Sequence, residues 1–539
     1  MVPDTRGIWL LLGLLWLLTL PLRPLFDPDE GRYAEIPREM VASGDWVTPR
    51  LNSVKYFEKP PLQYWATAAL YSVFGVSEWS SRLWAAVVGF LCMPMTFVFA
   101  MKSGQSRGVA VVAAAILAVS PFFVIVGQVN LLDQAFSSLL VAAVFAFVLA
   151  QRAADATTLR RWMLVTWGCL ALAVLSKGIV APVLAGATLA LYMLWTRSLA
   201  PMRRLHLLTG VPLFALIVVP WFVLVQRRNP EFAQFFFLHE HLARYLTTVH
   251  ERVEPWWYFI GLLLVAVSPV VGSLGRCRQV LRDAAAASTE FQTEKFLLTW
   301  CAVVLVFFSL SGSKLAPYML PIMAPLALLV APGVAAHPRA LRRAALTLFV
   351  SLCIIALSLL AYTWRRNGVV EWFAVAWTSA AVAGGFAAWR FARRHCLPLP
   401  DASRWLGLAA ASIFGYQGLI MAYSSLPPKR SAKLLASEVI PLINENQTLY
   451  SVGQFRHTLV FYLGRTVEVF AYRGELDFGL LQAGATANST DLPAFRRRWD
   501  LESNALAFVD PNVYAKLAAT GLPGRIVARD RRSVVVSRR

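Results

Sequence analysis

Charged residues and cysteines are both scarce in this sequence. Of its 539 residues, 15% are charged and 58% are hydrophobic, whereas about 25% of the residues of a soluble domain are charged. This composition excludes a soluble globular protein and indicates a polytopic membrane protein. The six cysteines lie in apolar runs or basic loops, none follows Cys396, and no pair has the spacing Cys-x-x-Cys. Their positions give no indication of a disulfide framework.

The sequence also shows no internal repeat and no nucleotide-sugar motif. Repeats are typical of transporters built from two related halves, so their absence counts against a transporter. Basic residues are in excess, with 51 Lys and Arg against 30 Asp and Glu, which in a soluble protein would suggest nucleic acid. Here they cluster in short loops between apolar runs, which is the topology signal of a membrane protein. We therefore expect no nucleic-acid partner.

Thirteen apolar runs are long enough to cross a bilayer. Alternate loops between them are rich in Arg and Lys, which marks those loops as cytoplasmic. The N-terminus is then cytoplasmic and, because thirteen is odd, the C-terminal part of the chain lies outside. The runs fall near residues 8–25, 83–101, 108–127, 132–151, 161–176, 179–196, 206–226, 255–275, 296–311, 315–334, 341–363, 371–391 and 404–425.

Two of the loops expected outside are long, at about residues 23–82 and 227–255. The first contains two amphipathic helix candidates, 31–43 and 61–74, whose apolar side chains suit the membrane interface. The second mixes an aromatic run with ionisable residues. We expect a transmembrane catalytic domain of residues 1–425 that includes both loops.

A small α/β domain is expected at residues 426–539, where the composition becomes that of a soluble protein. The residue patterns predict strands at 448–452, 467–470 and 505–509, helices at 432–443 and 511–520, and a hairpin of 525–528 with 533–537. This region contains no glycine-rich phosphate loop and no acid/base cluster. We therefore expect it to have a supporting role.

The most informative motif is FDPDEGRY at residues 26–33, where the chain leaves the first apolar run. Acidic residues at a membrane boundary are costly, so they usually have a function. The alternative is a solvated stop at the end of a helix. Carboxylates perform acid/base chemistry, and Lys and Arg bind phosphate. A site that moves a group linked to a lipid phosphate needs both kinds of residue, together with an apolar groove.

A second motif, YFEKPP at residues 56–61, places Lys59 directly before two prolines. The residue before a proline is restricted to extended conformations, so Lys59 cannot lie within a helix. Its ammonium group could then point at a phosphate. The alternative for Lys59 alone is a surface lysine in a turn.

Two short turns expected outside each place a lysine between small residues and a span. They are Ser176-Lys177-Gly178 and the segment from Ser311 to Lys314, which Tyr318 follows. The repetition suggests a shared anionic ligand, whereas snorkelling to the interface is the alternative for each lysine alone. Asp133 begins a span, where the helix dipole favours an acidic residue, so a structural role is the better interpretation of its position.

A metal site is the weakest of the signals. His239 and His241 are two residues apart, so on a helix they point in different directions and do not form an i,i+4 metal pair. One of them could combine with a carboxylate such as Glu58, because zinc accepts mixed ligands. A hydrogen-bonded histidine at the interface is the alternative that the residues favour.

Taken together, four motifs closely resemble those of the GT-C glycosyltransferases, which use polyprenyl-phosphate sugars. Within that superfamily they are most similar to the lipid A aminoarabinose transferase branch. The resemblance covers nearly the whole chain, is strong in the first loop and is loose in the C-terminal domain. Related mannosyl- and other glycosyltransferases share much of the first loop, so it specifies the superfamily better than the sugar. The motifs are FDPDEGRY (26–33), GDWVTP (44–49), FEKPPL (57–62) and SKLxxYxLP (313–321).

The resemblance implies a GT-C fold and a role for each matching residue. Asp29 would be the catalytic carboxylate, with Glu30 or Asp27 as its helper, and Lys59 would bind the donor phosphate. Glu58 and His239 would hold a metal, zinc in a structural role, and no nucleotide cofactor is implied. The residues expected to contact substrate are Arg32, Tyr33, Tyr56, Glu58, Asp133, Lys177, Arg244, Lys314 and Tyr318.

The implied reaction moves 4-amino-4-deoxy-L-arabinose from undecaprenyl phosphate to a lipid A phosphate, with inversion, at the periplasmic face of the bacterial inner membrane. The added positive charge would weaken the binding of polymyxin and other cationic peptides. A phosphate acceptor, with its second pKa near ~6, hardly needs a base, so Asp29 would orient it or stabilise positive charge on the sugar. A hydroxyl acceptor would need Asp29 as a base. We expect a monomer.

Two classes of alternative remain. Another polyprenyl-phosphate sugar, mannose among them, would fit the same motifs. A lipid transporter or flippase fits less well, because the charged residues gather at one face instead of near the middle of the membrane. A scaffold with a sensory outer domain ranks last, since it leaves FDPDEGRY unexplained.

Overall fold

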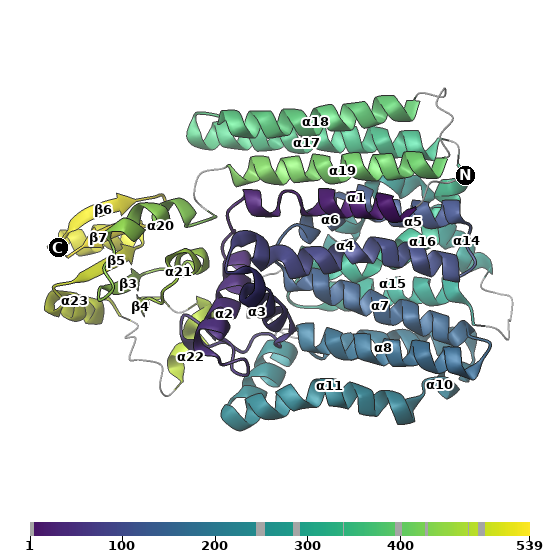
Figure 1. Ribbon diagram of the computed structural model, residues 1–539, viewed down its shortest axis with the longest axis horizontal. Helices are drawn as coiled ribbons and strands as arrows, with labels where there is room; N and C mark the ends of the chain where they lie inside the picture. The colour runs from purple at the N-terminus through teal and green to yellow at the C-terminus, as the bar shows by residue number, and fades with distance from the viewer. Residues whose placement is uncertain are drawn as a thin grey trace. The chain divides into compact units, whose positions relative to one another are not determined.

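The computed structural model consists of two units that each bring together separate stretches of the chain (Figure 1). The first unit contains Met1–Leu20 and Leu83–Ser425, and the second contains Pro21–Arg82 and Leu426–Arg539. The first loop is thus grouped with the C-terminal region, whereas the sequence analysis placed it with the spans. The structure describes residues 5–243, 254–283, 291–337, 339–393, 401–425, 430–472, 474–482 and 491–538.

Long apolar helices form the first unit and identify a membrane protein. Among the described residues, nine helices are long and apolar enough to cross a bilayer, and one bent pair makes a tenth. The expected number of thirteen is not confirmed. The α-helices of this unit, the short ones included, are α1 (Thr5–Leu17), α4 (Glu78–Lys102, which begins in the second unit), α5 (Arg107–Val119), α6 (Pro121–Gly127), α7 (Leu132–Arg152), α8 (Ala156–Lys177), α9 (Val180–Thr196), α10 (Ala200–Arg203), α11 (Leu207–Arg228), α13 (Tyr258–Ala266), α14 (Gly275–Asp283), α15 (Thr293–Leu310), α16 (Leu320–Ala336), α17 (Ala340–Asn367), α18 (Trp372–Arg393) and α19 (Asp401–Ser424).

The first helix, α1, is shorter than the apolar run that predicted it. Its last turn leaves backbone carbonyl groups without partners in the helix. The side chains of Gln128 and Gln417 donate hydrogen bonds of 3.0 and 2.9 Å to the carbonyl of Trp16. Two buried glutamines therefore satisfy the end of a helix where water is scarce.

Two other predicted spans are interrupted at prolines. The run 108–127 bends by 67° between α5 and α6, because Ser120 caps α6 and Pro121 occupies its first position. The run 255–275 ends its α-helix at Ala266 and continues as a 3₁₀ segment, Ser268–Ser273, that contains Pro269. Hydrophobicity predicted the apolar character of both runs but not their breaks.

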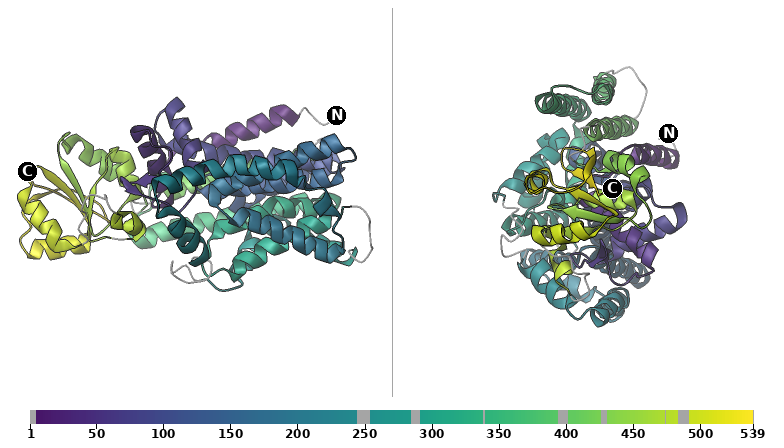
Figure 2. Two further views of the ribbon diagram at one scale, coloured as in Figure 1. Left: turned by 90° about the horizontal axis from the view of Figure 1, so that it is seen from below. Right: turned by 90° about the vertical axis from the view of Figure 1, so that its left-hand side faces the viewer.

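The long helices of the first unit run side by side (Figure 2). Helix α7 packs along α8 over most of its length, and α17, α18 and α19 pack against one another. Most side chains of α7 are buried within the unit. The first turn of α7, which contains Asp133, is therefore enclosed by other helices.

A five-stranded mixed sheet forms the C-terminal part of the second unit, in the order β4-β3-β5-β7-β6. Strand β3 pairs in parallel with β4 and β5, and β7 pairs antiparallel with β5 and β6. The predicted α/β class, the central strands and the final hairpin are confirmed. The elements are β3 (Thr448–Val452), β4 (Glu468–Phe470), β5 (Ala505–Val509), β6 (Arg525–Arg529), β7 (Val534–Ser537), α20 (Lys433–Val439), α21 (His457–Leu463), α22 (Asp477–Leu481), α23 (Leu492–Leu501) and α24 (Pro511–Ala519).

The first loop adds four elements to this unit: α2 (Asp29–Ser43), β1 (Arg50–Leu51), β2 (Val54–Lys55) and α3 (Leu62–Phe74). Helices α2 and α3 correspond to the two amphipathic candidates. Helix α2 packs against α21 of the C-terminal part so closely that a Cβ atom at Gly31 would lie 2.6 Å from the backbone nitrogen of Thr458. A glycine at this position of FDPDEGRY therefore permits the contact.

Glu30, the last of the three acidic residues in the motif, is held inside the unit. Both carboxylate oxygens of Glu30 accept hydrogen bonds from Arg82, at 2.7 and 2.9 Å, and Arg23 donates to the same group at 3.2 Å. All three side chains are 0% exposed. Removing one partner of a buried ion pair costs about 3–5 kcal/mol, because the other charge is left uncompensated.

We expect Glu30→Gln to lower the free energy of unfolding by about 3 kcal/mol, because Arg23 and Arg82 lose their buried counter-charge. Thermal unfolding of the detergent-purified protein measures this loss. Glu78→Gln is the matched control, since its partner Lys433 is 48% exposed, and it should cost no more than about 1 kcal/mol. Equal unfolding temperatures for the two variants would contradict a structural role for Glu30.

Candidate functional site

Arg32 is the centre of a charged cluster in the second unit. Helix α2 places it one turn after Asp29, and its Nη2 atom lies 3.1 Å from Oδ1 of Asp29. The same nitrogen lies 2.8 Å from Oε1 of Glu475. Glu58 lies 3.9 Å from Nη1, which also donates a 3.2 Å hydrogen bond to the hydroxyl of Tyr56. Three carboxylates and a phenol thus converge on one guanidinium group.

Exposure separates the members of this cluster. The side chain of Arg32 is only 5% exposed, whereas that of Asp29 is 48% exposed. A buried arginine that is bound on several sides holds its neighbours in place, and the exposed carboxylate remains accessible to a ligand. Of the two adjacent acids in the motif, Asp29 is therefore the one that can meet substrate, while Glu30 is enclosed by Arg23 and Arg82.

Tyr56 supplies a neutral hydrogen-bond donor next to Arg32. Burial raises the pKa of its phenol well above the ordinary value, although the positive charge of Arg32 opposes this shift. The hydroxyl is protonated at neutral pH, as that of an ordinary tyrosine is. Tyr33 lies close by, with Arg32 5.5 Å above its ring and Tyr64 stacked on it at 6.2 Å.

A tight hairpin positions the segment that carries Tyr56, Glu58 and Lys59. Its turn residues, Asn52 and Ser53, both have positive φ angles, as a two-residue hairpin turn requires. Their backbone N–H groups donate to the carboxylate of Glu39 at 2.5 and 2.8 Å. A buried acid on α2 thus fixes the turn that precedes the lysine.

The C-terminal part of the unit holds the same hairpin from the other side. The side-chain amide of Asn52 donates to the carbonyl of Val467 and accepts from its N–H, both at 2.8 Å. Gly479 lies against the backbone of Lys55, where a Cβ atom would approach the carbonyl to 2.5 Å. Lys59 itself donates a 2.7 Å hydrogen bond to the carbonyl of Glu58.

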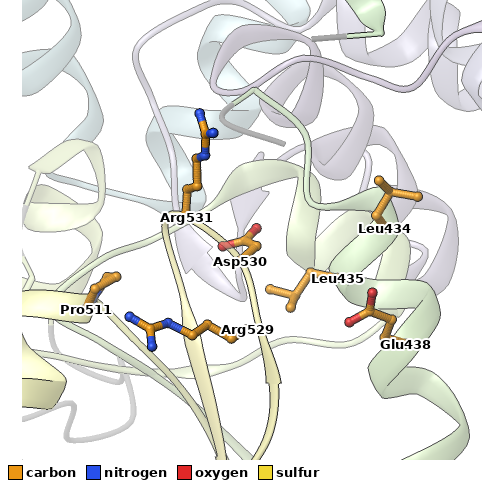
Figure 3. Close-up of a pocket in the computed structure, with 7 residues that line it drawn as sticks. All are labelled: Leu434, Leu435, Glu438, Pro511, Arg529, Asp530 and Arg531. Atoms are coloured by element: carbon orange, nitrogen blue, oxygen red, sulfur yellow. The ribbon is translucent and has the colours of Figure 1, made fainter. Parts of the chain in front are cut away.

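Asp27, the first acid of the motif, attaches the first loop to the C-terminal part of the unit. Its Oδ1 atom accepts a 2.8 Å hydrogen bond from the N–H of Thr458. Its Oδ2 atom lies 3.6 Å from both Arg456 and Arg532. A cavity of about 460 Å³ lies beside the turn that joins β6 to β7. It is lined by Leu434, Leu435, Glu438, Pro511, Arg529, Asp530 and Arg531 (Figure 3).

Sequence reasoning missed two residues of the cluster, Glu475 and His457. Glu475 bridges Arg32 and His457, whose Nε2 atom lies 3.1 Å from Oε2 of Glu475. Both residues come from the C-terminal part, which was expected to be only supportive. An isolated Glu and an isolated His more than 400 residues after the motif gave no local signal; only the contact between α2 and α21 brings them together.

A second cluster lies in the first unit, at the start of α7 and the end of α8. Lys177 forms an ion pair with Asp133. Its ammonium group also lies 4.1 Å from the ring centre of Tyr318 and 5.2 Å from that of Phe136. The structure thus brings together Asp133, Lys177 and Tyr318, as expected of residues that share a site. Lys314 instead donates to the carbonyl of Ser311 at 2.8 Å within its own turn.

The expected metal ligands, Glu58 and His239, belong to different units. Within the described parts of the chain, no group of three or more His, Cys, Asp or Glu residues could hold a metal ion. The ring of His239 stacks on Phe235 and its Nδ1 atom lies 3.4 Å from Glu240. Structural zinc sites almost always have four ligands, and zinc bound by Glu58 and His239 stays a prediction. Arg244 lies outside the described residues.

Two family models match the chain. The model of dolichyl-phosphate-mannose-protein mannosyltransferases matches residues 8–236, and that of the aminoarabinose transferase C-terminal domain matches residues 435–538. The first match covers FDPDEGRY, YFEKPP, Asp133 and Lys177. The second covers His457 and Glu475. The two models thus meet in the cluster around Arg32.

Full-length relatives carry the name undecaprenyl phosphate-α-4-amino-4-deoxy-L-arabinose arabinosyl transferase. The protein of Pseudomonas aeruginosa (strain UCBPP-PA14) is 30% identical over 514 residues, which cover 91% of this chain and 90% of that one. The protein of Erwinia tasmaniensis is 29% identical over 505 residues, covering 90% and 89%.

Solved structures agree with the sequence relatives. ArnT from Cupriavidus metallidurans bound to undecaprenyl phosphate superposes with a TM-score of 0.87 at 30% identity, covering 99% of this chain and 98% of that one. The apo state of the same protein gives a TM-score of 0.85 at 29% identity, covering 99% of both. The resemblance indicated by the sequence motifs is confirmed: the chain belongs to the family of undecaprenyl phosphate-α-4-amino-4-deoxy-L-arabinose arabinosyl transferases, within the GT-C glycosyltransferases.

Proposed function

We propose that this protein transfers 4-amino-4-deoxy-L-arabinose from undecaprenyl phosphate to a phosphate of lipid A. The relatives' name and the likeness to a structure bound to undecaprenyl phosphate support the donor. The single observation that carries the site assignment is the half-exposed carboxylate of Asp29, held by the buried guanidinium of Arg32. Both residues lie in the same unit as Lys59.

The chemistry needs an anion ligand and an oriented carboxylate. The leaving group is a lipid phosphate, whose developing charge the ammonium of Lys59 stabilises as a preorganised cation. Asp29 faces the acceptor or the sugar ring, and Arg32 fixes its orientation through the 3.1 Å contact. A lipid A phosphate is largely deprotonated at neutral pH, so Asp29 positions it or stabilises positive charge on the ring instead of removing a proton. Attack from the face opposite the leaving group inverts the anomeric carbon.

The Lys177 cluster is proposed to contribute a second anion ligand. Lys177 is held between Asp133 and the ring of Tyr318. An arriving phosphate would compete with Asp133 for the ammonium group, which is the exchange expected of a lysine that binds anions reversibly. Lys314, whose ammonium donates to a backbone carbonyl, is proposed to shape its own turn.

The remaining parts of the proposal concern the cell. The enzyme acts as a monomer in the bacterial inner membrane with its site facing the periplasm. The loop charges support this orientation, since the loops rich in Arg and Lys then lie in the cytoplasm. The transferred amino sugar adds positive charge to the outer surface, which lowers its attraction for polymyxin and other cationic peptides.

The direct test is to incubate the purified protein with undecaprenyl-phosphate-aminoarabinose and lipid A, and to read the mass of lipid A. We expect an increase of one aminopentose. Asp29→Asn should lower the rate at least about 100-fold, as loss of a positioned acid/base or charge-stabilising group does. Asp45→Asn is the matched control from the same loop, where the side chain accepts from the backbone of Val47 and Thr48.

The results for the native protein and for the variants distinguish an error in the proposed donor from an error in the proposed site. No mass increase with the native protein, together with transfer from another polyprenyl-phosphate sugar, would replace the proposed donor and keep the enzyme class. Full activity of Asp29→Asn would overturn the site assignment. Lys59→Ala should raise the donor concentration needed for half-maximal rate, since it removes a phosphate ligand.

A further prediction concerns Glu475, the residue of the C-terminal part that contacts Arg32. Glu475→Gln should lower turnover about tenfold, because a charge-assisted hydrogen bond to Arg32 contributes about 1.5 kcal/mol more than a neutral one. Glu468→Gln is the control, as Glu468 lies in the same domain but only faces Arg498 at 3.7 Å on the surface. Steady-state rates of the two variants, with thermal unfolding as a check on folding, measure the difference. Equal rates would remove Glu475 from the site.

A further inference from the structure

A cavity lined by two arginines lies in the first unit, far from the cluster of Lys177, Asp133 and Tyr318. Helix α7 begins beside Asp133 and ends at Arg152, and α8 returns to end at Lys177. The cavity is at the Arg152 end, about 30 Å away at 1.5 Å per helical residue. It has a volume of about 400 Å³ and is lined by Gln151, Arg152, Ala153, Tyr192, Thr196, Ser198, Ala200, Pro201, Arg204 and Phe291.

The lining of this cavity suits an anion. It contains two arginines, and none of the described residues that line it is acidic. Arg204 is fixed in place because its Nη2 atom donates to the carbonyls of Ala150 and Ala153, at 3.1 and 2.5 Å. Its Nε atom is buried and has no hydrogen-bond partner among the residues that the structure describes. That atom has no accessible surface, so an anion in the cavity meets the positive charge of Arg204 and not this N–H group.

Arg152 and Tyr192 add to the same polar wall. Arg152 donates from Nη1 to the carbonyl of Ser103 at 2.9 Å, which leaves a forked group with further N–H donors. The hydroxyl of Tyr192 accepts a 2.8 Å hydrogen bond from the N–H of Gln292. Its own proton can therefore be donated to a ligand. Two guanidinium groups and a phenol are the donors that phosphate oxygens prefer.

The cavity beside the C-terminal hairpin serves as a comparison, because its lining does not favour an anion. It also contains two arginines, but Glu438 and Asp530 line it too. Figure 3 shows the guanidinium groups of Arg529 and Arg531 pointing in different directions. Mixed charge and divergent cations do not select an anion, whereas none of the described residues that line the cavity at Arg152 and Arg204 is acidic.

The surroundings of the Arg204 cavity indicate a lipid as the source of the phosphate. Helices α7 and α9 end at this cavity, and α11 begins three residues after Arg204. Large apolar side chains close to it in the sequence are exposed in the structure: Leu194 by 74%, Leu199 by 70% and Leu208 by 94%. Such side chains in a spanning unit face acyl chains, and basic cavities between helices at this level bind anionic headgroups.

We propose that the Arg152–Arg204 cavity binds the phosphate of an anionic glycerophospholipid from the leaflet at that end of the spans. The loop charges mark this leaflet as the cytoplasmic one. The bound headgroup joins the ends of α7 and α9 to α10, on the side of the membrane opposite the Lys177 cluster. The site is therefore separate from the one proposed at Lys177.

Native mass spectrometry of the full-length protein in detergent, titrated with phosphatidylglycerol and with phosphatidylcholine, tests this site. We expect preferential binding of phosphatidylglycerol. Arg152→Gln and Arg204→Gln should each weaken it about tenfold. Arg203→Gln is the matched control, because Arg203 is the exposed neighbour of Arg204 and does not line the cavity. It should change binding less than twofold.

Competitors identify the source of the phosphate. Inorganic phosphate at millimolar concentration should displace little lipid if acyl chains contribute; complete displacement would show a site for free phosphate. Undecaprenyl phosphate that competes as well as phosphatidylglycerol would overturn the assignment to a glycerophospholipid. Arg204→Gln also removes two bonds to carbonyl groups, whereas Arg152→Gln removes one, to Ser103, so Arg152→Gln is the variant that perturbs the local structure less. Unchanged binding by Arg152→Gln in a normally folded protein would overturn the proposal.

Discussion

The ion pairs of the buried Glu30 carboxylate are the interaction on which the FDPDEGRY motif depends. The carboxylate neutralises Arg23 and Arg82, and all three side chains are withdrawn from solvent. Successive residues of a helix point about 100° apart. Once Glu30 is fixed inward, its neighbour Asp29 is directed outward, and Arg32 follows one turn later. Two adjacent acids of the same chemistry thus acquire different environments from a single ion-pair cluster.

The C-terminal domain belongs to the architecture of the site. Asp27 is held by Thr458, and Asn52 pairs with Val467 as if it were a neighbouring strand. Glu475 reaches the guanidinium of Arg32 directly. The first loop therefore gains its shape from a region that follows it by about four hundred residues, and its few short elements would bury too little surface to be stable alone.

Sequence reasoning succeeded where the information is local. The strands 448–452 and 505–509, the helix starts near Asp29 and Leu62, and the motif that marks the family are all visible in short windows. It failed where contacts between distant segments decide. The end of α1 depends on two glutamines from other helices, and the part played by Glu475 depends on the packing of α2 on α21. Neither leaves a trace in the neighbouring residues.

The pairing of Asn52 with Val467 has a consequence for exchanging parts between related enzymes. The amide of Asn52 completes the backbone hydrogen bonds at the start of β4, while Gly479 leaves room for the strand beside it. A chimera that takes its C-terminal domain from another enzyme, joined near residue 426, would lose the match between Asn52 and Val467 and between Lys55 and Gly479. The natural module for recombination is discontinuous, and loop and domain must be inherited from the same parent.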